Sequence, residues 1–463
     1  MDFIGREKEM RLLENQYLHV EHPLVIVKGR RRVGKSRLIK EFCKDKPNFF
    51  FQANRESAHS LLSSFNLALS KHLGVNINPD TWEDSISMFV KLSGPGRKIL
   101  VIDEFTYITK SNRDAEKEFQ SIWDNTLSKE DVMFILCGSY KGLMEDLTDY
   151  GGALYGRNTC DLTVLPLKFR DCIRGKDYRY AVEEYAFTGG IPHYMELMDR
   201  ERPVLDNIER LTMSLGSPLM TEISYLMEEE FRDTAIYNTL LKTIAQGNRK
   251  MESITSATRL KASDVMPYLS RLIGMGMVES KVSQKERSPE KSRNRLYTIS
   301  DRFIAMWYRF VYPYKNDIAL GINDEAVREL NDHYIDSHVA FVFEDISRSE
   351  LRRYLRSKSI AASYGSYWDG KTEIDVVAID SKNKTLYAGE CKYRKDKIGA
   401  EVVNHLVDAC SNLRAFKEYE VILCFFSASG YTEAALAAMN GHNALVFDNG
   451  ELITGYGTIT IGR

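Results

Sequence analysis

The chain has 463 residues, of which 43% are hydrophobic and 28% are charged, and its formal net charge is −2. This length is typical of several globular domains in one chain, and the balanced charge excludes a protein that is basic throughout. Its seven cysteines form no C-x-x-C pair, and no apolar run reaches the roughly 18 residues of a membrane span, which favours a cytoplasmic protein without a membrane partner.

A phosphate-binding loop follows the first predicted strand. The apolar run 24–27 precedes Gly29-Arg-Arg-Arg-Val-Gly34-Lys35-Ser36, which fits G-x-x-x-x-G-K-[ST], and a helix-compatible stretch follows it. Backbone N–H groups of the glycine-rich loop, Lys35 and the helix N-terminus would cradle the phosphates, while Ser36 would hold Mg²⁺. This order of strand, loop and helix predicts that the protein binds ATP with Mg²⁺.

Two further strands are predicted to end beside this loop. An apolar run leads to Asp103 and Glu104, which is the order of a Walker B strand. Asp103 would help to hold Mg²⁺, and Glu104 would polarise the attacking water. A third apolar run, 132–138, ends at Ser139, which either contacts the γ-phosphate or caps the helix that follows. Strands that alternate with helices predict a doubly wound parallel sheet, with the nucleotide at the carboxyl ends of its strands.

On these motifs the chain resembles the archaeal-type ATPases of the P-loop class, which are related to the AAA+ and STAND NTPases. The segment 3–7 (F-I-G-R-E) resembles the element that packs near the nucleotide base, and 154–157 (L-Y-G-R) resembles the segment with the family's candidate arginine finger. The resemblance implies that Arg6 binds nucleotide and that Arg157 stabilises transition-state charge, in trans if the protein is a homo-oligomer. A surface salt bridge is the alternative role of Arg157.

Three helices and a polar hairpin are predicted after a helical lid at 171–230. The helices are expected at 236–245, 251–258 and 263–273, and a loop rich in Lys and Arg joins the hairpin strands. This order is typical of a winged helix-turn-helix, assigned to residues 231–312, which the resembled family commonly carries. Its third helix and its wing would contact DNA. The alternative is a solvated wing on a protein–protein module.

A second hairpin is predicted near the C-terminus, with strands at 371–380 and 385–392. Folding about the polar turn between them places Asp375 opposite Glu390. Two facing carboxylates repel each other by up to about 1 kcal/mol. A divalent cation between them would remove this repulsion, and Lys392 would orient or activate a water.

These residues resemble the motif of the PD-(D/E)xK nuclease superfamily, and Glu344 matches its upstream helical acid. The resemblance implies an α/β restriction-endonuclease-like domain over 313–463, with Asp375 and Glu390 as ligands of Mg²⁺ or Mn²⁺ and with Lys392 beside them. Ordinary cross-strand charge pairing and a degenerate nuclease fold are the alternatives. Basic residues nearby would supply a surface for the DNA backbone: Arg348, Arg352, Arg353, Arg394, Lys395 and Lys397.

The sequence thus predicts an α/β multidomain protein in which an ATPase core, 1–170, controls DNA binding and metal-dependent phosphodiester cleavage. ATP and Mg²⁺ are the expected cofactors and DNA is the expected partner. A second interpretation is an ATP-driven switch or DNA-binding regulator whose C-terminal fold is an inactive docking domain.

Overall fold

The computed structural model describes residues 3–112, 114–139, 141–286, 288–442 and 444–453. The chain forms two compact units. The first runs up to Asp171 and includes Gly190–Glu196, and the second consists of Cys172–Gly189 and the chain from Leu197 onward. Arg287, which belongs to the predicted basic wing, lies outside the described residues.

The first unit is built on a five-stranded sheet with the order β2-β3-β4-β1-β5, and all neighbouring strands are parallel. Its strands are β1 (Leu24–Lys28), β2 (Asn48–Gln52), β3 (Lys98–Asp103), β4 (Val132–Gly138) and β5 (Cys160–Thr163). Every residue of β1, β3 and β4 is buried, as expected for parallel strands that are covered on both faces. The predicted parallel sheet is therefore confirmed.

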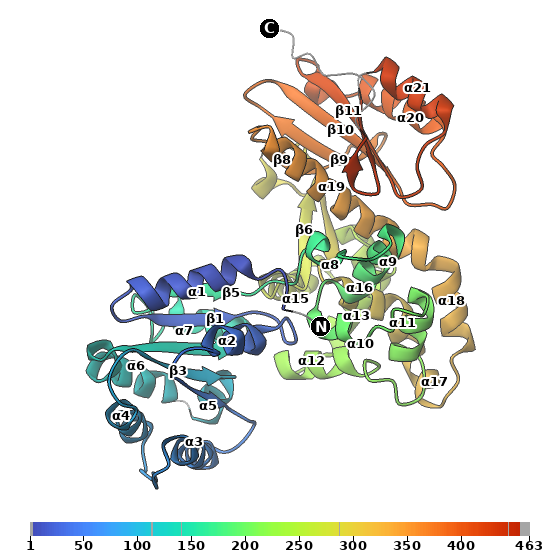
Figure 1. Ribbon diagram of the computed structural model, residues 1–463. Coiled ribbons are helices and arrows are strands. Elements are labelled where there is room, and N and C mark those ends of the chain that lie inside the picture. The colour runs from blue at the N-terminus through green and yellow to red at the C-terminus, as the bar shows by residue number, and fades with distance from the viewer. Residues whose placement is uncertain (1–2, 113, 140, 287, 443, 454–463) are drawn as a thin grey trace. The chain divides into compact units, whose positions relative to one another are not determined.

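Helices lie on both faces of this sheet, with α1 and α2 on one face and α3, α4 and α6 on the other (Figure 1). The helices of the first unit are α1 (Glu7–His19), α2 (Lys35–Cys43), α3 (Ala58–Leu73), α4 (Trp82–Leu92), α5 (Thr106–Ser111), α6 (Ala115–Asn125) and α7 (Lys141–Thr148). Phe65, Phe89 and Phe119 of the second group pack into one apolar cluster with the sheet. This cluster fixes the helices and leaves the strand ends to form a site.

The strand order brings three loops to one edge of the sheet. Lys28 at the end of β1 pairs with Gly138 at the end of β4, and Ile102 of β3 pairs with Leu136 of β4. Because β4 lies between β1 and β3, the residues that follow all three strands meet at their carboxyl ends. This edge holds the phosphate-binding loop, the two acids after β3 and Ser139.

Two short helices lie near the points where the chain passes between the units, α8 (Phe169–Cys172) and α10 (Pro192–Leu197). The helices of the second unit up to the hairpin are α9 (Tyr178–Thr188), α11 (Val204–Thr212), α12 (Glu222–Glu230), α13 (Ala235–Ala245), α14 (Met251–Thr258) and α15 (Ala262–Gly274). An antiparallel hairpin follows, made of β6 (Val278–Val282) and β7 (Arg295–Ile299). The order of three helices and a hairpin is the one expected from the sequence.

Further helices connect this hairpin to the C-terminal sheet: α16 (Arg302–Met306), α17 (Lys315–Ala319), α18 (Asp324–Tyr334) and α19 (Ala340–Ser357). Two π-helical turns, Trp307–Val311 and Ile335–Val339, continue α16 and α18. Trp307 is 1% exposed, so this aromatic segment belongs to the core of the second unit.

The C-terminal sheet has the order β13-β12-β11-β10-β9-β8 and mixes parallel with antiparallel pairs. Its strands are β8 (Ser363–Trp368), β9 (Glu373–Asp380), β10 (Thr385–Lys392), β11 (Glu420–Ser427), β12 (Leu445–Asp448) and β13 (Glu451–Leu452). Residues of α20 (Ala400–Ser411) and α21 (Glu433–Gly441) share an apolar cluster with β9, β10 and β11, and the two helices are seen beside the sheet in Figure 1.

The β9–β10 hairpin has the register expected from the sequence, from the Asp380–Thr385 pair to the Val376–Gly389 pair. Asp380 fixes its turn, since its Oδ1 accepts hydrogen bonds from the backbone N of Lys382 (3.0 Å) and of the next residue (3.1 Å). Short polar side chains that bind their own following backbone are typical of such turns.

Candidate functional site

The phosphate-binding loop connects β1 to α2 and is shaped by two glycines. Gly34 precedes α2 with φ of 97°, a left-handed conformation that glycine adopts at little cost. Gly29 has φ of 154°, and a Cβ atom there would lie 2.4 Å from the carbonyl oxygen of Val164. Both positions therefore require glycine, and the loop delivers the first N–H groups of α2 to the edge of the sheet.

Lys35 is the first residue of α2 and is 4% exposed. Its Nζ donates to the carbonyl oxygens of Gly29 (2.9 Å) and Arg30 (3.1 Å) and to Oγ of Ser139 (2.8 Å). Within the described ranges none of these partners is an acid. A buried ammonium group with neutral partners fits an anionic ligand, because a phosphate would compensate its charge.

Two residues that were predicted to hold magnesium contact each other directly. Ser36 Oγ donates to Asp103 Oδ2 at 2.6 Å, and Asp103 is fully buried at the end of β3. The other carboxylate oxygen of Asp103 accepts from the backbone N of Glu104 at 3.1 Å. A hydroxyl and a carboxylate oxygen at the phosphate-binding loop are ligands that fit Mg²⁺.

Glu104 sits next to this pair in a strained conformation, with φ of 54°. Its Oε1 accepts from Ser139 Oγ at 2.7 Å, whereas its Oε2 is buried and has no hydrogen-bond partner among the described residues. Ser139 therefore bridges Lys35 and Glu104. A buried carboxylate oxygen without a partner fits a water molecule bound at this point, and strain of this kind is frequent at functional sites.

Arg6 is buried beside the loop and ties the N-terminal segment to it. Its guanidinium donates to the carbonyl oxygens of Val33 (2.9 Å) and Leu165 (2.7 Å) and forms an ion pair with Glu9 (3.1 Å). A small pocket adjoins these contacts, with apolar lining from Phe3, Ile4, Val33, Leu167 and Pro192. A contact of Arg6 with nucleotide stays a prediction, and the adjoining pocket has the apolar character that a base requires.

Arg157 forms a bidentate ion pair with Asp124, with both N···O distances at 2.8 Å. The pair is partly exposed, and it holds the pKa of Asp124 below its usual value through hydrogen bonding to Arg157. This is the alternative role considered from the sequence. A finger role in trans would require the side chain to leave Asp124, and it stays a prediction.

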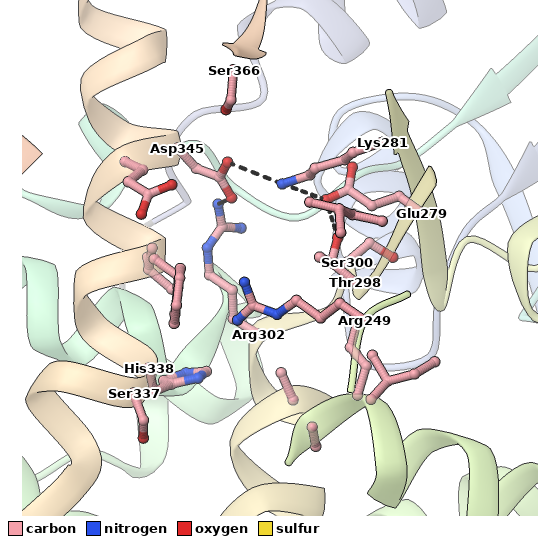
Figure 2. A pocket seen from close by; sticks show the side chains of 18 of the residues that line it. Arg249, Glu279, Lys281, Thr298, Ser300, Arg302, Ser337, His338, Asp345 and Ser366 are labelled. Carbon is pink, nitrogen blue, oxygen red and sulfur yellow. Dashed lines mark hydrogen bonds and ion pairs between the residues drawn. The ribbon is translucent and has the colours of Figure 1, made fainter. Parts of the chain in front are cut away.

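The predicted wing is anchored to the C-terminal sheet rather than free at its base. The backbone N of Gln284 donates to the carbonyl oxygen of Ser366 (3.0 Å), and the backbone N of Trp368 donates to Oγ of Ser283 (2.9 Å). Lys281 of β6 is partly exposed and forms ion pairs with Glu279 (3.0 Å) and Asp345 (3.7 Å). A cavity lies between this hairpin, α16 and α19 (Figure 2).

Asp375 lies in a β-bulge that sequence reasoning missed. Gly365 of β8 pairs with Val377 of β9 and Tyr367 pairs with Ile374, so β9 contains one extra residue at this point. The β9–β10 ladder ends at the Val376–Gly389 pair. The regular β9–β10 ladder thus ends one pair before Asp375 and Glu390, and the direct pairing of these two residues stays a prediction.

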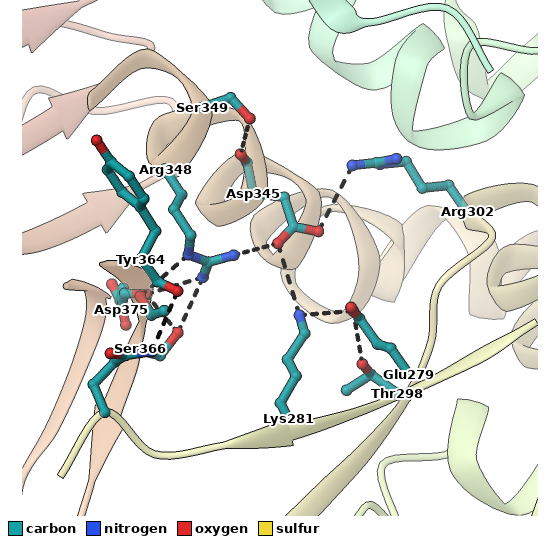
Figure 3. A network of polar contacts seen from close by, with 12 residues as sticks. Glu279, Lys281, Thr298, Arg302, Asp345, Arg348, Ser349, Tyr364, Ser366 and Asp375 are labelled. Carbon is teal, nitrogen blue, oxygen red and sulfur yellow. Dashed lines mark hydrogen bonds and ion pairs between the residues drawn. The ribbon is translucent and has the colours of Figure 1, made fainter. Parts of the chain in front are cut away.

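Side chains from two neighbouring elements support the bulge (Figure 3). The carbonyl oxygen of Asp375 accepts from Ser366 Oγ (2.8 Å) and from Arg348 Nη2 (3.2 Å), and its carboxylate accepts from the backbone N of Cys391 (3.0 Å). Arg348 also donates to Asp345 Oδ1 at 2.6 Å. Arg348 was predicted to face DNA, but it is turned inward to this network.

The acidic residues nevertheless lie near one another. Burial, together with the charge of Glu390, raises the pKa of Asp375 to about 6. Burial and the charge of Asp375 raise the pKa of Glu344 to about 8. Lys392 Nζ donates to Glu390 Oε1 at 2.6 Å. The four residues predicted for a metal site therefore interact with one another through charge or hydrogen bonding.

The fit of this cluster to a metal ion is partial. Carboxylates that are buried and repel each other favour a bound cation. However, no group of three or more His, Cys, Asp or Glu side chains in the described part of the chain is placed to hold a metal ion. A cation held by Asp375 and Glu390 would need water or phosphate oxygens to complete its coordination.

Comparison with known families identifies two regions of the chain. Residues 3–198 match the family described as an ATPase domain predominantly from Archaea. Residues 307–403 match DUF234, a family of archaeal and bacterial proteins of unknown function.

Within the described ranges, every helix is too short or too polar to cross a membrane.

Among curated proteins, an uncharacterized protein of Methanocaldococcus jannaschii is 28% identical over 433 residues, which cover 90% of this chain and 94% of that protein. An uncharacterized ATP-binding protein of the same organism is 43% identical over 44 residues, which cover 10% of this chain and 75% of that protein.

Among solved structures, a Walker-type ATPase of Pyrococcus abyssi matches with a TM-score of 0.49 and 20% identity, over 66% of this chain and 96% of its own. The ORC1 protein of Aeropyrum pernix in complex with DNA matches with a TM-score of 0.33 and 15% identity, over 68% of this chain and 95% of its own.

Proposed function

We propose that this chain, which joins an archaeal-type P-loop ATPase domain to a DUF234 region, uses ATP hydrolysis to control how its second unit engages and cleaves DNA. The observation that carries the ATPase half is the set of contacts among five side chains at the sheet edge. They are Lys35, Ser36, Asp103, Glu104 and Ser139.

Each side chain has a separate task in this proposal. Bound Mg²⁺ would neutralise phosphate charge, and Ser36 and Asp103 are placed to hold it. Lys35 binds the outer phosphates. Ser139 positions the side chains of Lys35 and Glu104 by hydrogen bonding to both. Glu104 orients the attacking water with its free oxygen. The hydrolysis step therefore depends on Glu104, whereas nucleotide binding depends on Lys35.

The ATPase half is tested by comparing Lys35→Ala with wild type in nucleotide binding and in phosphate release. We expect Lys35→Ala to abolish measurable turnover, because the buried phosphate contact is lost. The matched control is Lys91→Ala, which removes an exposed lysine from the same unit. Equal turnover in Lys35→Ala and wild type would contradict the assignment.

The DNA half rests on the acidic cluster of the C-terminal sheet. Asp375 and Glu390 would hold Mg²⁺ or Mn²⁺, which would supply a metal-activated water for phosphodiester hydrolysis. Lys392 would orient that water or the phosphate, and Glu344 would hold a proton or a second water. The support is the shared burial and electrostatic coupling of Asp375, Glu390 and Glu344.

A second candidate function is an ATP-driven switch whose C-terminal fold docks a partner without cleaving DNA. The contact that favours it is the ion pair between Lys392 and Glu390. In this pair the lysine and the carboxylate bind each other instead of a water molecule and a metal ion. Incubation of the protein with plasmid and single-stranded DNA plus Mn²⁺ separates the two. Cleavage that Asp375→Ala and Lys392→Ala abolish supports the nuclease, and cleavage that survives both substitutions excludes this site.

A further inference from the structure

A cavity of about 140 Å³ lies inside the second unit, between the β6–β7 hairpin, α16 and α19 (Figure 2). It is separate from the ATP site, and Asp375 and Glu390 are not among its lining residues. A second cavity of about 430 Å³ adjoins it and shares four lining residues with it, and the two together are called the groove below. The shared residues are Arg249, Leu296, Trp368 and Glu373.

Arg249 lines both cavities of this groove and carries a positive charge. Its guanidinium lies 4.0 Å from the centre of the Phe341 ring, and burial lowers the pKa of Arg249. No hydrogen bond or ion pair of this guanidinium is found among the described residues. Figure 2 shows its side chain reaching toward that of Arg302. Arg249 is only partly buried, so its guanidinium, which lacks acceptors among the described residues, is open to a ligand that supplies oxygens.

Other donors in the groove are also short of acceptors. Arg302 Nε and Trp368 Nε1 are buried and have no hydrogen-bond partner in the part of the chain that the structure describes. Asp345 lies 3.7 Å from Arg302, but it is shared with Lys281 (3.7 Å) and Arg348 (2.6 Å). Lys281 is also paired with Glu279 at 3.0 Å, so Arg302 has only the longer contact with Asp345 as an ion pair among the described residues.

The remaining acids do not satisfy these donors. Glu344 and Glu373 line the cavity, and their charges act on Arg249, but neither is hydrogen-bonded to it among the described residues. A ligand with several oxygens would supply acceptors for these donors. A phosphate group meets this requirement, because its oxygens match the fork of an arginine.

We propose that this groove binds the backbone of single-stranded DNA, with one phosphate between Arg249 and Arg302. The first cavity, at about 140 Å³, has room for a phosphate group. The second cavity gives room for the neighbouring nucleotide. Phe341 is 41% exposed beside Arg249 and offers a surface on which a base can stack.

This groove extends the proposed function, and cleavage of the bound strand rests on that function. Glu344 lines the same cavity and interacts electrostatically with Asp375. A strand held by Arg249 and Arg302 would thus pass beside the acidic cluster. The substrate class would then be single-stranded DNA. The strand would be bound by this groove and not by the third helix and the wing loop of the predicted winged helix.

The test measures binding of a fluorescein-labelled oligo-dT by fluorescence anisotropy, with the full-length protein in EDTA so that no cleavage occurs. We expect Arg249→Ala to weaken binding about tenfold or more, because a charge-assisted contact to phosphate is lost. The salt dependence should also fall by about 0.7 in slope. Arg328→Ala removes an exposed arginine of α18 in the same unit and should leave binding unchanged.

A further variant keeps the outcome interpretable. Arg249→Lys preserves the charge without the planar fork and should bind between wild type and Arg249→Ala. Because binding is measured in EDTA, it is read whether or not the wild-type protein cleaves DNA, so a missing nuclease activity does not mimic failure of the groove. Wild-type affinity in Arg249→Ala would overturn the proposal. Competition by dTMP equal to that of the oligomer would overturn the assignment of a strand.

Discussion

The substitution Glu104→Gln isolates one charge at the ATPase site. Gln retains the size of the side chain and an oxygen that can accept from Ser139, which lies 2.7 Å from Glu104 Oε1. Both residues would face the same backbone strain at φ of 54°. The variant therefore removes the ability to polarise water while it leaves the contacts of Lys35 and Ser36 in place.

A positioned general base contributes roughly 10²- to 10⁴-fold to rate, which corresponds to about 3–5 kcal/mol of activation free energy. We expect Glu104→Gln to lower kcat for phosphate release by a factor in this range and to bind a fluorescent ATP analogue with unchanged affinity. Glu83→Gln, an exposed acid of α4, is the matched control and should hydrolyse ATP normally. Normal turnover in Glu104→Gln would show that another residue orients the water.

Three further substitutions probe other parts of the account. Arg157→Ala should change the free energy of unfolding by less than about 1 kcal/mol, because its ion pair with Asp124 is partly exposed; a larger loss in denaturant titration would contradict this. Gly29→Ala should weaken ATP binding and lower the unfolding midpoint, since its Cβ would lie 2.4 Å from the Val164 carbonyl oxygen; wild-type binding would refute the close approach. Burial lowers the pKa of His338 from 6.5 to about 4. The unfolded chain then binds the proton more tightly, so stability should fall by up to about 3 kcal/mol as pH drops from 6.5 through 4, and His338→Gln should flatten this slope in thermal unfolding.

Local patterns were sufficient for the ATPase half of the site. The phosphate-binding loop and the acids after β3 are short motifs attached to fully buried strands, so their local structure follows from neighbouring residues. The strand order was not available in this way. That β4 lies between β1 and β3, with Ser139 between Lys35 and Glu104, depends on contacts between residues about 35 to 104 positions apart.

At the C-terminal site, too, local pairing could be predicted from the sequence, whereas features that depend on distant residues could not. Simple counting about the turn correctly predicted the pairs from Asp380–Thr385 to Val376–Gly389. Such counting could not reveal the bulge at Asp375, because the bulge arises from the pairing with β8 and is supported by Arg348, which is 27 residues away. The spacing of Asp345 and Arg348 by three helical positions was the one local signal that Arg348 is engaged inside the unit.

Metal-dependent DNA cleavage with and without ATP tests the central claim most directly. The substrate is a single-stranded oligomer in Mn²⁺, and the proteins are wild type, Lys35→Ala and Asp375→Asn. The account predicts cleavage by wild type at a rate that changes when ATP is added, a rate in Lys35→Ala that ATP does not change, and no cleavage by Asp375→Asn. Cleavage by Asp375→Asn at the wild-type rate, or a wild-type rate that ATP leaves unchanged, would contradict it.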